Sequence, residues 1–151
     1  MKYKLMTVVG TRPEIIRLSE IIKKLDISFN HVLVHTNQNF DNKLKDVFFK
    51  ELELKKPRYD LKIKEKNAIS TIAKILIKIE EVLKKEKPDA FFVLGDTNSS
   101  LSAIVAKKYK IPTVMDNTWA SHLFCDPMYL GIDIIIDAGT KYINGHSDVL
   151  I

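Results

Sequence analysis

Cysteine and long apolar runs are both scarce in this sequence. Cys125 is the single cysteine among 151 residues, which excludes an internal disulfide and suits a reducing compartment. The apolar run 5–9 near the start has only five residues, too few for the core of a signal peptide or for a membrane span. We therefore expect a cytoplasmic protein without a membrane partner.

The sequence also lacks a recognisable metal-binding motif. The candidates His122, Cys125, His146 and Asp148 have a spacing that matches no standard zinc site. We expect no metal.

The charge is unevenly divided along the chain. Residues 1–112 carry 23 Lys and Arg against 14 Asp and Glu, a net +9, whereas residues 113–151 carry Lys141 against five Asp, a net −4. A basic stretch is compatible with nucleic-acid binding, but the lysines fall mostly on expected helix faces and between elements. Solvated lysine faces explain this pattern better, and we expect no nucleic-acid partner.

Short apolar runs alternate with longer stretches of helical spacing, which indicates strands alternating with helices. Short β-branched runs predict strands at residues 4–9, 31–35, 59–63, 91–94, 113–115 and 132–136. Helical spacing predicts helices at 14–25, 41–49, 69–83 and 99–109. In the third helix, an inward stripe is expected from Ile69, Ile72, Ala73, Leu76, Ile79, Val82 and Leu83. In the fourth, the inward residues are expected to be Leu101, Ile104 and Val105.

This alternation predicts an α/β fold: a three-layer, Rossmann-like parallel sheet with right-handed crossovers and strand order 3-2-1-4-5. The run 132–136 is expected to join as a sixth strand, parallel and next to 113–115. Residues 117–131 would then form the crossover, with a short helical stretch around 126–130. The only domain boundary that the sequence indicates is at Pro112, where the residue pattern and the net charge change.

Two loops follow neighbouring strands of the predicted sheet, residues 10–14 and 95–100. Ligands of such sheets bind where the strand order reverses, which is between these strands. Thr11 and Glu14 have the spacing of a capping box, and free N–H groups there, together with Arg12 and Arg17, would suit a diphosphate. Local sequence alone leaves a second interpretation open, in which the arginines are surface residues and Asp96 only caps a helix.

Four motifs then appear in order. They are Thr7-Val-Val-Gly-Thr-Arg-Pro-Glu-Ile-Ile-Arg17, His35-Thr-Asn-Gln-Asn-Phe-Asp41, Lys87-Pro-Asp89 and Val93-Leu-Gly-Asp-Thr-Asn-Ser99. With them, residues 1–112 resemble the non-hydrolysing UDP-N-acetylglucosamine 2-epimerases. The resemblance implies half of a glycosyltransferase-B-like fold and a reaction that eliminates UDP and adds it back. It implies Asp96 as a catalytic carboxylate and substrate binding by Gly10, Arg12, Arg17 and Gln38.

The chain departs from that family after Pro112. The family continues with His-x-Glu-Ala-Gly, whose Glu is a catalytic acid/base, whereas this chain reads Thr113-Val-Met-Asp-Asn-Thr-Trp119. Asp116 lies within about one position of the missing Glu, and a one-residue slip in a strand reverses the side chain's face. The second domain, with its uridine pocket and catalytic His, lies outside these residues. We therefore expect at most weak binding of UDP or a UDP-sugar.

Residues 113–151 resemble a second family, the pyridoxal-phosphate enzymes of the cystathionine β-lyase and γ-synthase group. The motifs are Val114-Met-Asp-Asn-Thr-Trp-Ala120, Gly131-Ile-Asp-Ile and Gly139-Thr-Lys-Tyr-Ile-Asn-Gly-His-Ser-Asp148. The resemblance implies that Asp116 pairs with the pyridine nitrogen, that Lys141 forms the Schiff base and that Thr140 helps to hold the phosphate. Ala138 stands where that family has a hydroxyl residue, so we expect no functional pyridoxal-phosphate site.

Three hypotheses follow for the function. The first is a UDP-sugar epimerase carried by residues 1–112, and the second is a pyridoxal-phosphate lyase carried by residues 113–151. The third is a non-catalytic remnant that folds and binds nucleotide weakly. We favour the third, because groups that act as a catalytic unit fail together when some are missing. The oligomeric state is not predicted.

Overall fold

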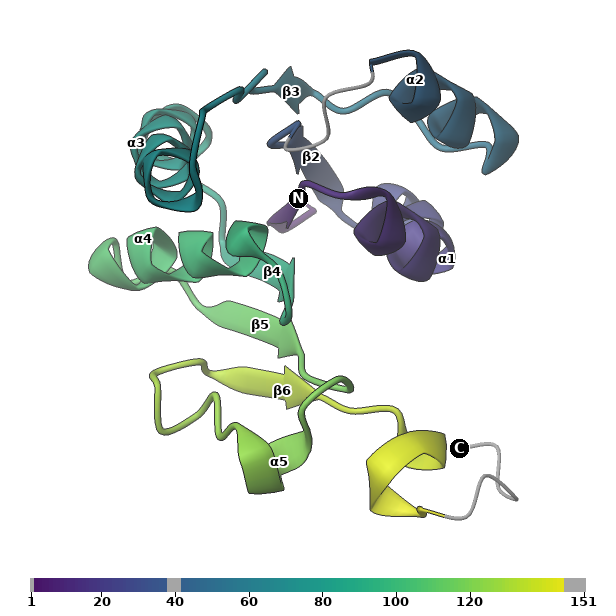
Figure 1. Ribbon diagram of the computed structural model, residues 1–151, viewed down its shortest axis with the longest axis vertical. Coiled ribbons are helices and arrows are strands. Elements are labelled where there is room, and N and C mark those ends of the chain that lie inside the picture. Colours follow the sequence, from purple (N-terminus) through teal and green to yellow (C-terminus); the bar gives the residue numbers. More distant parts are fainter. Residues whose placement is uncertain (1, 38–41, 146–151) are drawn as a thin grey trace.

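Six parallel strands form one sheet in the order β3-β2-β1-β4-β5-β6 (Figure 1). A computed structural model describes residues 2–37 and 42–145. The strands are β1 (Lys4–Val9), β2 (Asn30–His35), β3 (Tyr59–Asp60), β4 (Ala90–Leu94), β5 (Thr113–Asp116) and β6 (Ile134–Ile136). The predicted order is confirmed, and so is the parallel pairing of β6 with β5.

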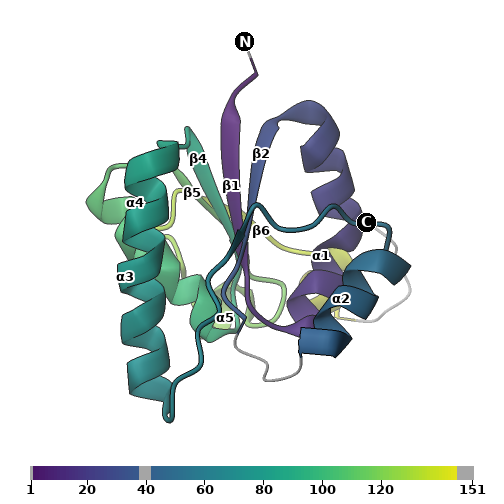
Figure 2. The ribbon, with the colours of Figure 1, turned by 90° about the horizontal axis from the view of Figure 1, so that it is seen from above.

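Helices cover both faces of the sheet, as in the predicted three layers. They are α1 (Arg12–Ser28), α2 (Asn42–Glu51), α3 (Ala68–Glu86), the 3₁₀ turn η1 (Asn98–Ser102), α4 (Ala103–Lys108), α5 (Ser121–Phe124) and the π turn η2 (Gly139–Ile143). Figure 2 shows α3 and α4 on one side of the sheet and α1 and α2 on the other.

Each face of the sheet has its own core, because successive residues of a strand point to opposite faces. Met6 and Val8 of β1 and Phe91 of β4 are buried on the α3 face. Their neighbours Leu5 and Phe92 are buried on the α1 face. The α3-side core continues through partly buried Met115 and Ile135, whereas the α1-side core reaches no further than Val114 of β5.

The predicted inward faces of the two helices on the α3 side are partly wrong. Ile69 is 77% exposed, because the 19-residue α3 is about 28 Å long and overhangs strands of about 17–20 Å. Leu101 and Ile104 are also exposed, while Ser102, Ala103 and Ala106 are buried with Val105. Residues 98–102 form a 3₁₀ turn with three residues per turn, which shifts the face that continues into α4.

The crossover from β5 to β6 is helical at Ser121–Phe124 rather than at residues 126–130. There the Asp126 carboxylate accepts hydrogen bonds from the backbone N–H groups of Met128 (3.0 Å) and Tyr129 (3.3 Å). Such local side-chain bonds favour a turn over a helix. The chain then reverses at Gly131, whose φ of +97° is easily adopted only without a side chain.

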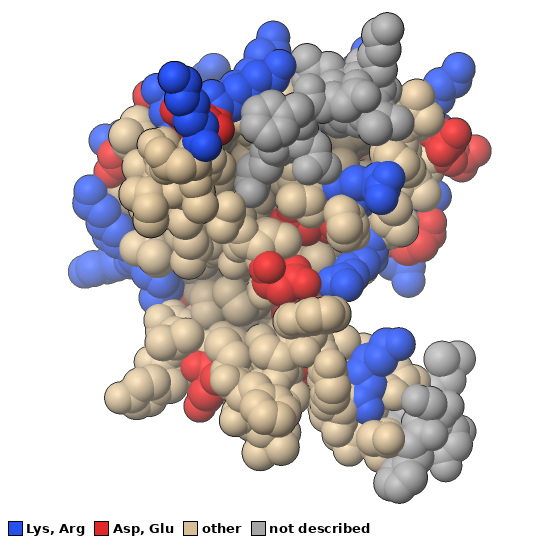
Figure 3. Space-filling model, viewed as in Figure 1, with Lys and Arg blue, Asp and Glu red and all other residues tan. Residues whose placement is uncertain are grey.

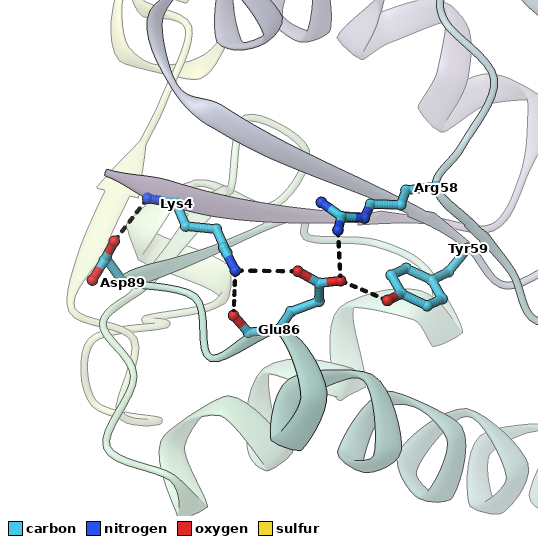
Figure 4. Close-up of polar contacts among 5 residues, drawn as sticks. All are labelled: Lys4, Arg58, Tyr59, Glu86 and Asp89. Atoms are coloured by element: carbon cyan, nitrogen blue, oxygen red, sulfur yellow. Dashed lines mark hydrogen bonds and ion pairs between the residues drawn. The ribbon is translucent and has the colours of Figure 1, made fainter. Parts of the chain in front are cut away.

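The end of α3 is fixed to the sheet by a polar cluster around Glu86 (Figure 4). The buried Glu86 carboxylate accepts a hydrogen bond from the Tyr59 hydroxyl. It also forms ion pairs with Lys4 Nζ at 3.2 Å and with Arg58 Nη2 at 3.3 Å. Burial by itself raises the pKa of Glu86, but hydrogen bonds from Tyr59 and Lys4 and the charge of Arg58 outweigh it, so the pKa lies below its ordinary value. The cluster joins β1, β3 and α3.

Candidate functional site

The side chain of Glu14 occupies the loop that follows β1. Glu14 Oε2 accepts hydrogen bonds from the N–H groups of Gly10 (2.8 Å) and Thr11 (2.7 Å), and its Oε1 accepts one from the Thr97 hydroxyl (2.8 Å). The capping box predicted from Thr11 and Glu14 is formed. The expectation of free N–H groups is wrong for Gly10 and Thr11, because Glu14 is already their anionic partner.

Glu14 is fully buried. Burial raises the pKa of its carboxyl above the ordinary value, although the hydrogen bonds from Gly10, Thr97 and Thr11 act in the opposite direction. Through Thr97, the same carboxylate ties the loop after β1 to the loop after β4. The position of both loops therefore depends on one side chain in the first turn of α1.

The two candidate arginines point to different partners. Arg17 Nη1 lies 3.3 Å from Asp96 Oδ2, and its guanidinium carbon lies 5.6 Å from the centre of the Trp119 ring. The guanidinium carbon of Arg12 instead lies 5.5 Å from the centre of the Phe48 ring. The structure therefore brings Arg17 and Asp96 together and directs Arg12 elsewhere.

A cavity of about 810 Å³ opens beyond the carboxyl ends of β4 and β5. Its walls come from both halves of the chain, and they are formed by Arg17, Leu94, Gly95, Asp96, Asp116, Thr118, Trp119, Ala138, Lys141, Tyr142 and Gly145. The cavity holds two carboxylates and two basic groups beside two aromatic rings. Such a set can bind a ligand that carries both an anionic group and a flat ring.

Gly95 allows the two strand ends that carry the carboxylates to lie close together. Its N–H donates to the backbone oxygen of Asp116 at 2.9 Å. A side-chain carbon at position 95 would lie 2.9 Å from that oxygen and 3.0 Å from the sulfur of Met115. Asp96 follows β4 and Asp116 is the last residue of β5, so both carboxylates lie at the same edge of the sheet. Both line the cavity.

The residues that resemble a pyridoxal-phosphate site are only partly assembled. Asp116 and Lys141 line the same cavity, and Asp116 Oδ1 accepts the N–H of Thr118 at 3.0 Å. Lys141 is exposed and lies in the π turn η2. Thr140, which the resemblance implies for the phosphate, does not line the cavity, and Ala138 offers no hydroxyl there. The residues that line the cavity therefore do not fit the cofactor.

Three site residues remain: Gln38, which was predicted, and Trp119 and Tyr142, which were not. Gln38 lies outside the described residues. Trp119 and Tyr142 were not predicted as site residues, although each follows a predicted strand end by only a few residues, which is the signal that could have marked them.

Residues 2–37 and 42–145 offer neither a cluster of metal ligands nor a helix that could span a bilayer. No group of three or more His, Cys, Asp or Glu side chains there is placed to hold a metal ion. No helix there has the length and apolar character needed to cross a bilayer.

Comparison with known proteins places most of the chain in one family. The sequence model of the UDP-N-acetylglucosamine 2-epimerase family matches residues 23–114. A UDP-N-acetylglucosamine 2-epimerase of Methanocaldococcus jannaschii is 46% identical over 110 residues, which cover 72% of this chain and 30% of that protein. The chain thus spans about a third of the length of the curated relatives it matches.

Solved structures extend the likeness in fold. The UDP-N-acetylglucosamine 2-epimerase of Rickettsia bellii is 38% identical, with a TM-score of 0.78 over 91% of this chain and 39% of its own. The M. jannaschii epimerase, solved in complex with UDP-GlcNAc and UDP, is 41% identical, with a TM-score of 0.73 over 80% of this chain and 34% of its own. Both coverages exceed what residues 1–112 alone would supply, so the fold of the epimerases continues beyond Pro112.

The second resemblance is also found. A putative cystathionine β-lyase of Saccharomyces cerevisiae is 62% identical over 47 residues, which cover 31% of this chain and 14% of that protein. This similarity is shorter than the epimerase similarity. The chain belongs to the UDP-N-acetylglucosamine 2-epimerase family.

Proposed function

We propose that this chain binds UDP or a UDP-sugar weakly at the carboxyl ends of β1 and β4. The observation that carries the proposal is the pair of Arg17 and Asp96 on the wall of the cavity beyond the carboxyl ends of β4 and β5. A guanidinium is the best side chain for a diphosphate, since it is always charged and donates two parallel hydrogen bonds. A relative 41% identical to this chain was solved with UDP-GlcNAc and UDP, which supports the choice of ligand.

The binding is expected to be no tighter than millimolar. The N–H groups of Gly10 and Thr11 are already bound to Glu14, so the diphosphate depends on arginine side chains. Arg17 must also exchange its contact with Asp96 for the ligand. Few contacts remain to offset the cost of immobilising a nucleotide, and millimolar affinity corresponds to only about 4 kcal/mol.

We further propose that these 151 residues do not epimerise the sugar by themselves. Asp96 is the candidate catalytic carboxylate, and Asp116 faces the same cavity. The resemblance implies a catalytic Glu within about one position of Asp116, but neither neighbour, Met115 or Asn117, is a carboxylate. The Asn117 side chain is buried and donates to the Cys125 backbone oxygen at 3.1 Å. Because catalytic groups act as a unit, loss of one of the two carboxylates removes most of the rate.

We also propose that the chain joins two ancestries near Pro112. Residues 1–112 would derive from the nucleotide-binding domain of an epimerase, and residues 113–151 from a pyridoxal-phosphate enzyme. Both parents have a parallel strand at this point, so β5 and β6 could replace their counterparts without changing the sheet. The change of net charge from +9 to −4 at this position supports the junction.

A titration with UDP, followed by the amide signals in NMR, tests the binding. The first signals to shift should be those of residues 10–14 and 95–99. Arg17→Ala should weaken binding about tenfold or more, because hydrogen bonds to a charged group contribute about 1.5–3 kcal/mol. Lys24→Ala is the matched control, since it removes one exposed positive charge from the same helix and should leave the affinity unchanged.

Two results would contradict the proposal. Shifts confined to other parts of the sheet would place the ligand elsewhere, and equal losses in Arg17→Ala and Lys24→Ala would reduce the binding to general charge. Incubation with UDP-N-acetylglucosamine tests the absence of turnover, and appearance of the 2-epimer in the NMR spectrum would refute it.

A further inference from the structure

Trp119 is an exposed aromatic ring on the wall of the cavity beyond β4 and β5. It is 60% exposed and lies in the turn between β5 and α5. The guanidinium carbon of Arg17 lies 5.6 Å from the centre of its ring. Figure 3 shows the part of the molecule beyond β5 mostly without charge, whereas Lys and Arg gather over the rest of that face. The group proposed to bind the diphosphate therefore lies beside a large apolar ring.

The backbone around Trp119 is held in place by the chain itself. Asn117 donates its N–H to the backbone oxygen of Ile136 at 2.9 Å, and its side chain donates to the backbone oxygen of Cys125 at 3.1 Å. The N–H of Ala120 closes the turn by donating to the backbone oxygen of Asn117 at 3.1 Å. Because the turn is already ordered, a ligand that contacts the ring loses little affinity to ordering of the chain.

The polar groups next to Trp119 bind one another. The N–H of Thr118 donates to Asp116 Oδ1 at 3.0 Å, and the Thr118 hydroxyl accepts the N–H of Ala138 at 2.9 Å. Discrimination between bases requires hydrogen bonds to the edge of the base, whereas an aromatic face can stack with every base. The surroundings of Trp119 thus favour stacking over recognition of the base edge.

We propose that Trp119 stacks with the base of a nucleoside diphosphate, and that the site therefore accepts purine as well as pyrimidine nucleotides. This rests on the proposed function, in which Arg17 binds the diphosphate. A nucleotide separates its base from its diphosphate by one ribose, so two neighbouring side chains, such as Arg17 and Trp119, can hold both ends at once. A purine covers more of an indole ring than uracil does, so ADP should bind at least as tightly as UDP.

Titrations of the 151-residue chain with UDP, ADP and inorganic pyrophosphate test the stacking. Trp119 is the single tryptophan of the chain, so tryptophan fluorescence reports on this ring alone. Both nucleotides should change the fluorescence in a saturable manner, because a stacked base replaces water on the face of the indole. The amide shifts of residues 10–14 and 95–99 give the affinities independently of the fluorescence.

Two variants of Trp119 separate stacking from other contacts. Trp119→Leu should weaken binding of ADP and UDP about fivefold or more, because the stack of a base on an aromatic ring contributes at least that factor. Trp119→Phe keeps an aromatic face and should restore most of the affinity. Both variants should fold, since the side chain is largely exposed.

A second ligand and a second ring are the controls. Pyrophosphate has no base, so Trp119→Leu should change its affinity by less than about twofold. Tyr129→Leu is the matched variant, since Tyr129 is 89% exposed and lies outside the residues that line the cavity. It should leave the affinity for both nucleotides unchanged.

Four results would overturn the assignment of Trp119. They are unchanged fluorescence at UDP concentrations that saturate the amide shifts, full nucleotide affinity in Trp119→Leu, binding of ADP about tenfold or more weaker than that of UDP, and equal losses for nucleotides and pyrophosphate in Trp119→Leu. The first three would leave the proposed binding of UDP at Arg17 in place, and the fourth would mean that Trp119 only positions Arg17. If UDP shifts no amide signal, the proposed function is refuted as well.

Discussion

The sharpest test of the site concerns Glu14, which holds both loops in place. In Glu14→Ala, the buried N–H of Gly10, the half-buried N–H of Thr11 and the Thr97 hydroxyl all lose their acceptor. An unsatisfied buried donor costs about 1–3 kcal/mol. Removal of a carboxylate that burial penalises offsets part of this cost, so we expect a loss of about 2–4 kcal/mol of unfolding free energy. For a chain of this length, that corresponds to a fall in Tm of about 5–12 °C.

Glu14→Gln removes the negative charge of the side chain but keeps its hydrogen bonds. The amide oxygen can still accept from Gly10 and Thr11, and the amide nitrogen can donate to the Thr97 hydroxyl, so the variant should lie within about 1 kcal/mol of wild type at neutral pH. Burial raises the folded-state pKa of Glu14, so the folded protein holds this proton more tightly than the unfolded chain. Its contribution to stability is therefore present below the unfolded pKa, near 4.5, and is lost as pH rises through the folded pKa. Relative to wild type, the glutamine variant should become more stable as pH rises through that window.

Urea unfolding followed by circular dichroism between pH 4 and pH 8 measures both effects. Glu20→Ala is the control, because Glu20 lies on the same helix, is 74% exposed and forms a surface ion pair with Lys23 at 2.8 Å. It should change stability by less than about 0.5 kcal/mol. The reasoning is refuted if Glu14→Ala is no more destabilising than Glu20→Ala, or if Glu14→Gln is as damaging as Glu14→Ala.

Three further predictions concern other parts of the molecule. Glu86→Ala should lower the unfolding free energy by about 2–4 kcal/mol, because it leaves Tyr59 and two basic groups without their buried acceptor; a loss below about 0.5 kcal/mol in urea, the level of an ordinary surface substitution, would contradict this. The pKa of Asp133 is lowered to about 2 by the Lys107 hydrogen bond and by both donors of Thr113, so its stabilisation is present above its unfolded pKa of 3.8 and is lost as pH falls towards about 2. Asp133→Asn should flatten the dependence of unfolding free energy on pH between these two values. If the variant loses stability at acid pH as the wild type does, Asp133 is not the group responsible. Pyridoxal phosphate should give only a slow imine absorbance, equal in rate in wild type and Lys141→Ala, because Lys141 is an exposed amine like most of the 21 lysines; a saturable, stoichiometric imine band lost in the variant would reveal a formed site.

The arrangement of the elements could be predicted from the sequence, because it depends on patterns a few residues long. The short β-branched run at 4–9 predicted the bounds of β1, and the helical period from Glu14 onward marked α1. When strands alternate with helices, a parallel sheet covered by helices pairs the backbone groups of the strands and buries the apolar faces of both. Few other arrangements do so. The sixth strand followed from the same pattern, since β6 pairs parallel with β5 after a crossover of its own.

Only the tertiary structure decided which side chains meet. The sequence placed Arg12, Arg17 and Asp96 at strand ends, but it could not say that Arg17 would reach Asp96, 79 positions away, while Arg12 would turn to Phe48. The burial of Glu14 was equally hidden, because a capping box looks the same whether or not a second loop covers it. Local propensity reports on neighbours along the chain, whereas burial, pKa and the exposure of β6 depend on elements brought together from distant positions. For this reason the exposure of Ile134 and Ile136 becomes visible only in the folded sheet.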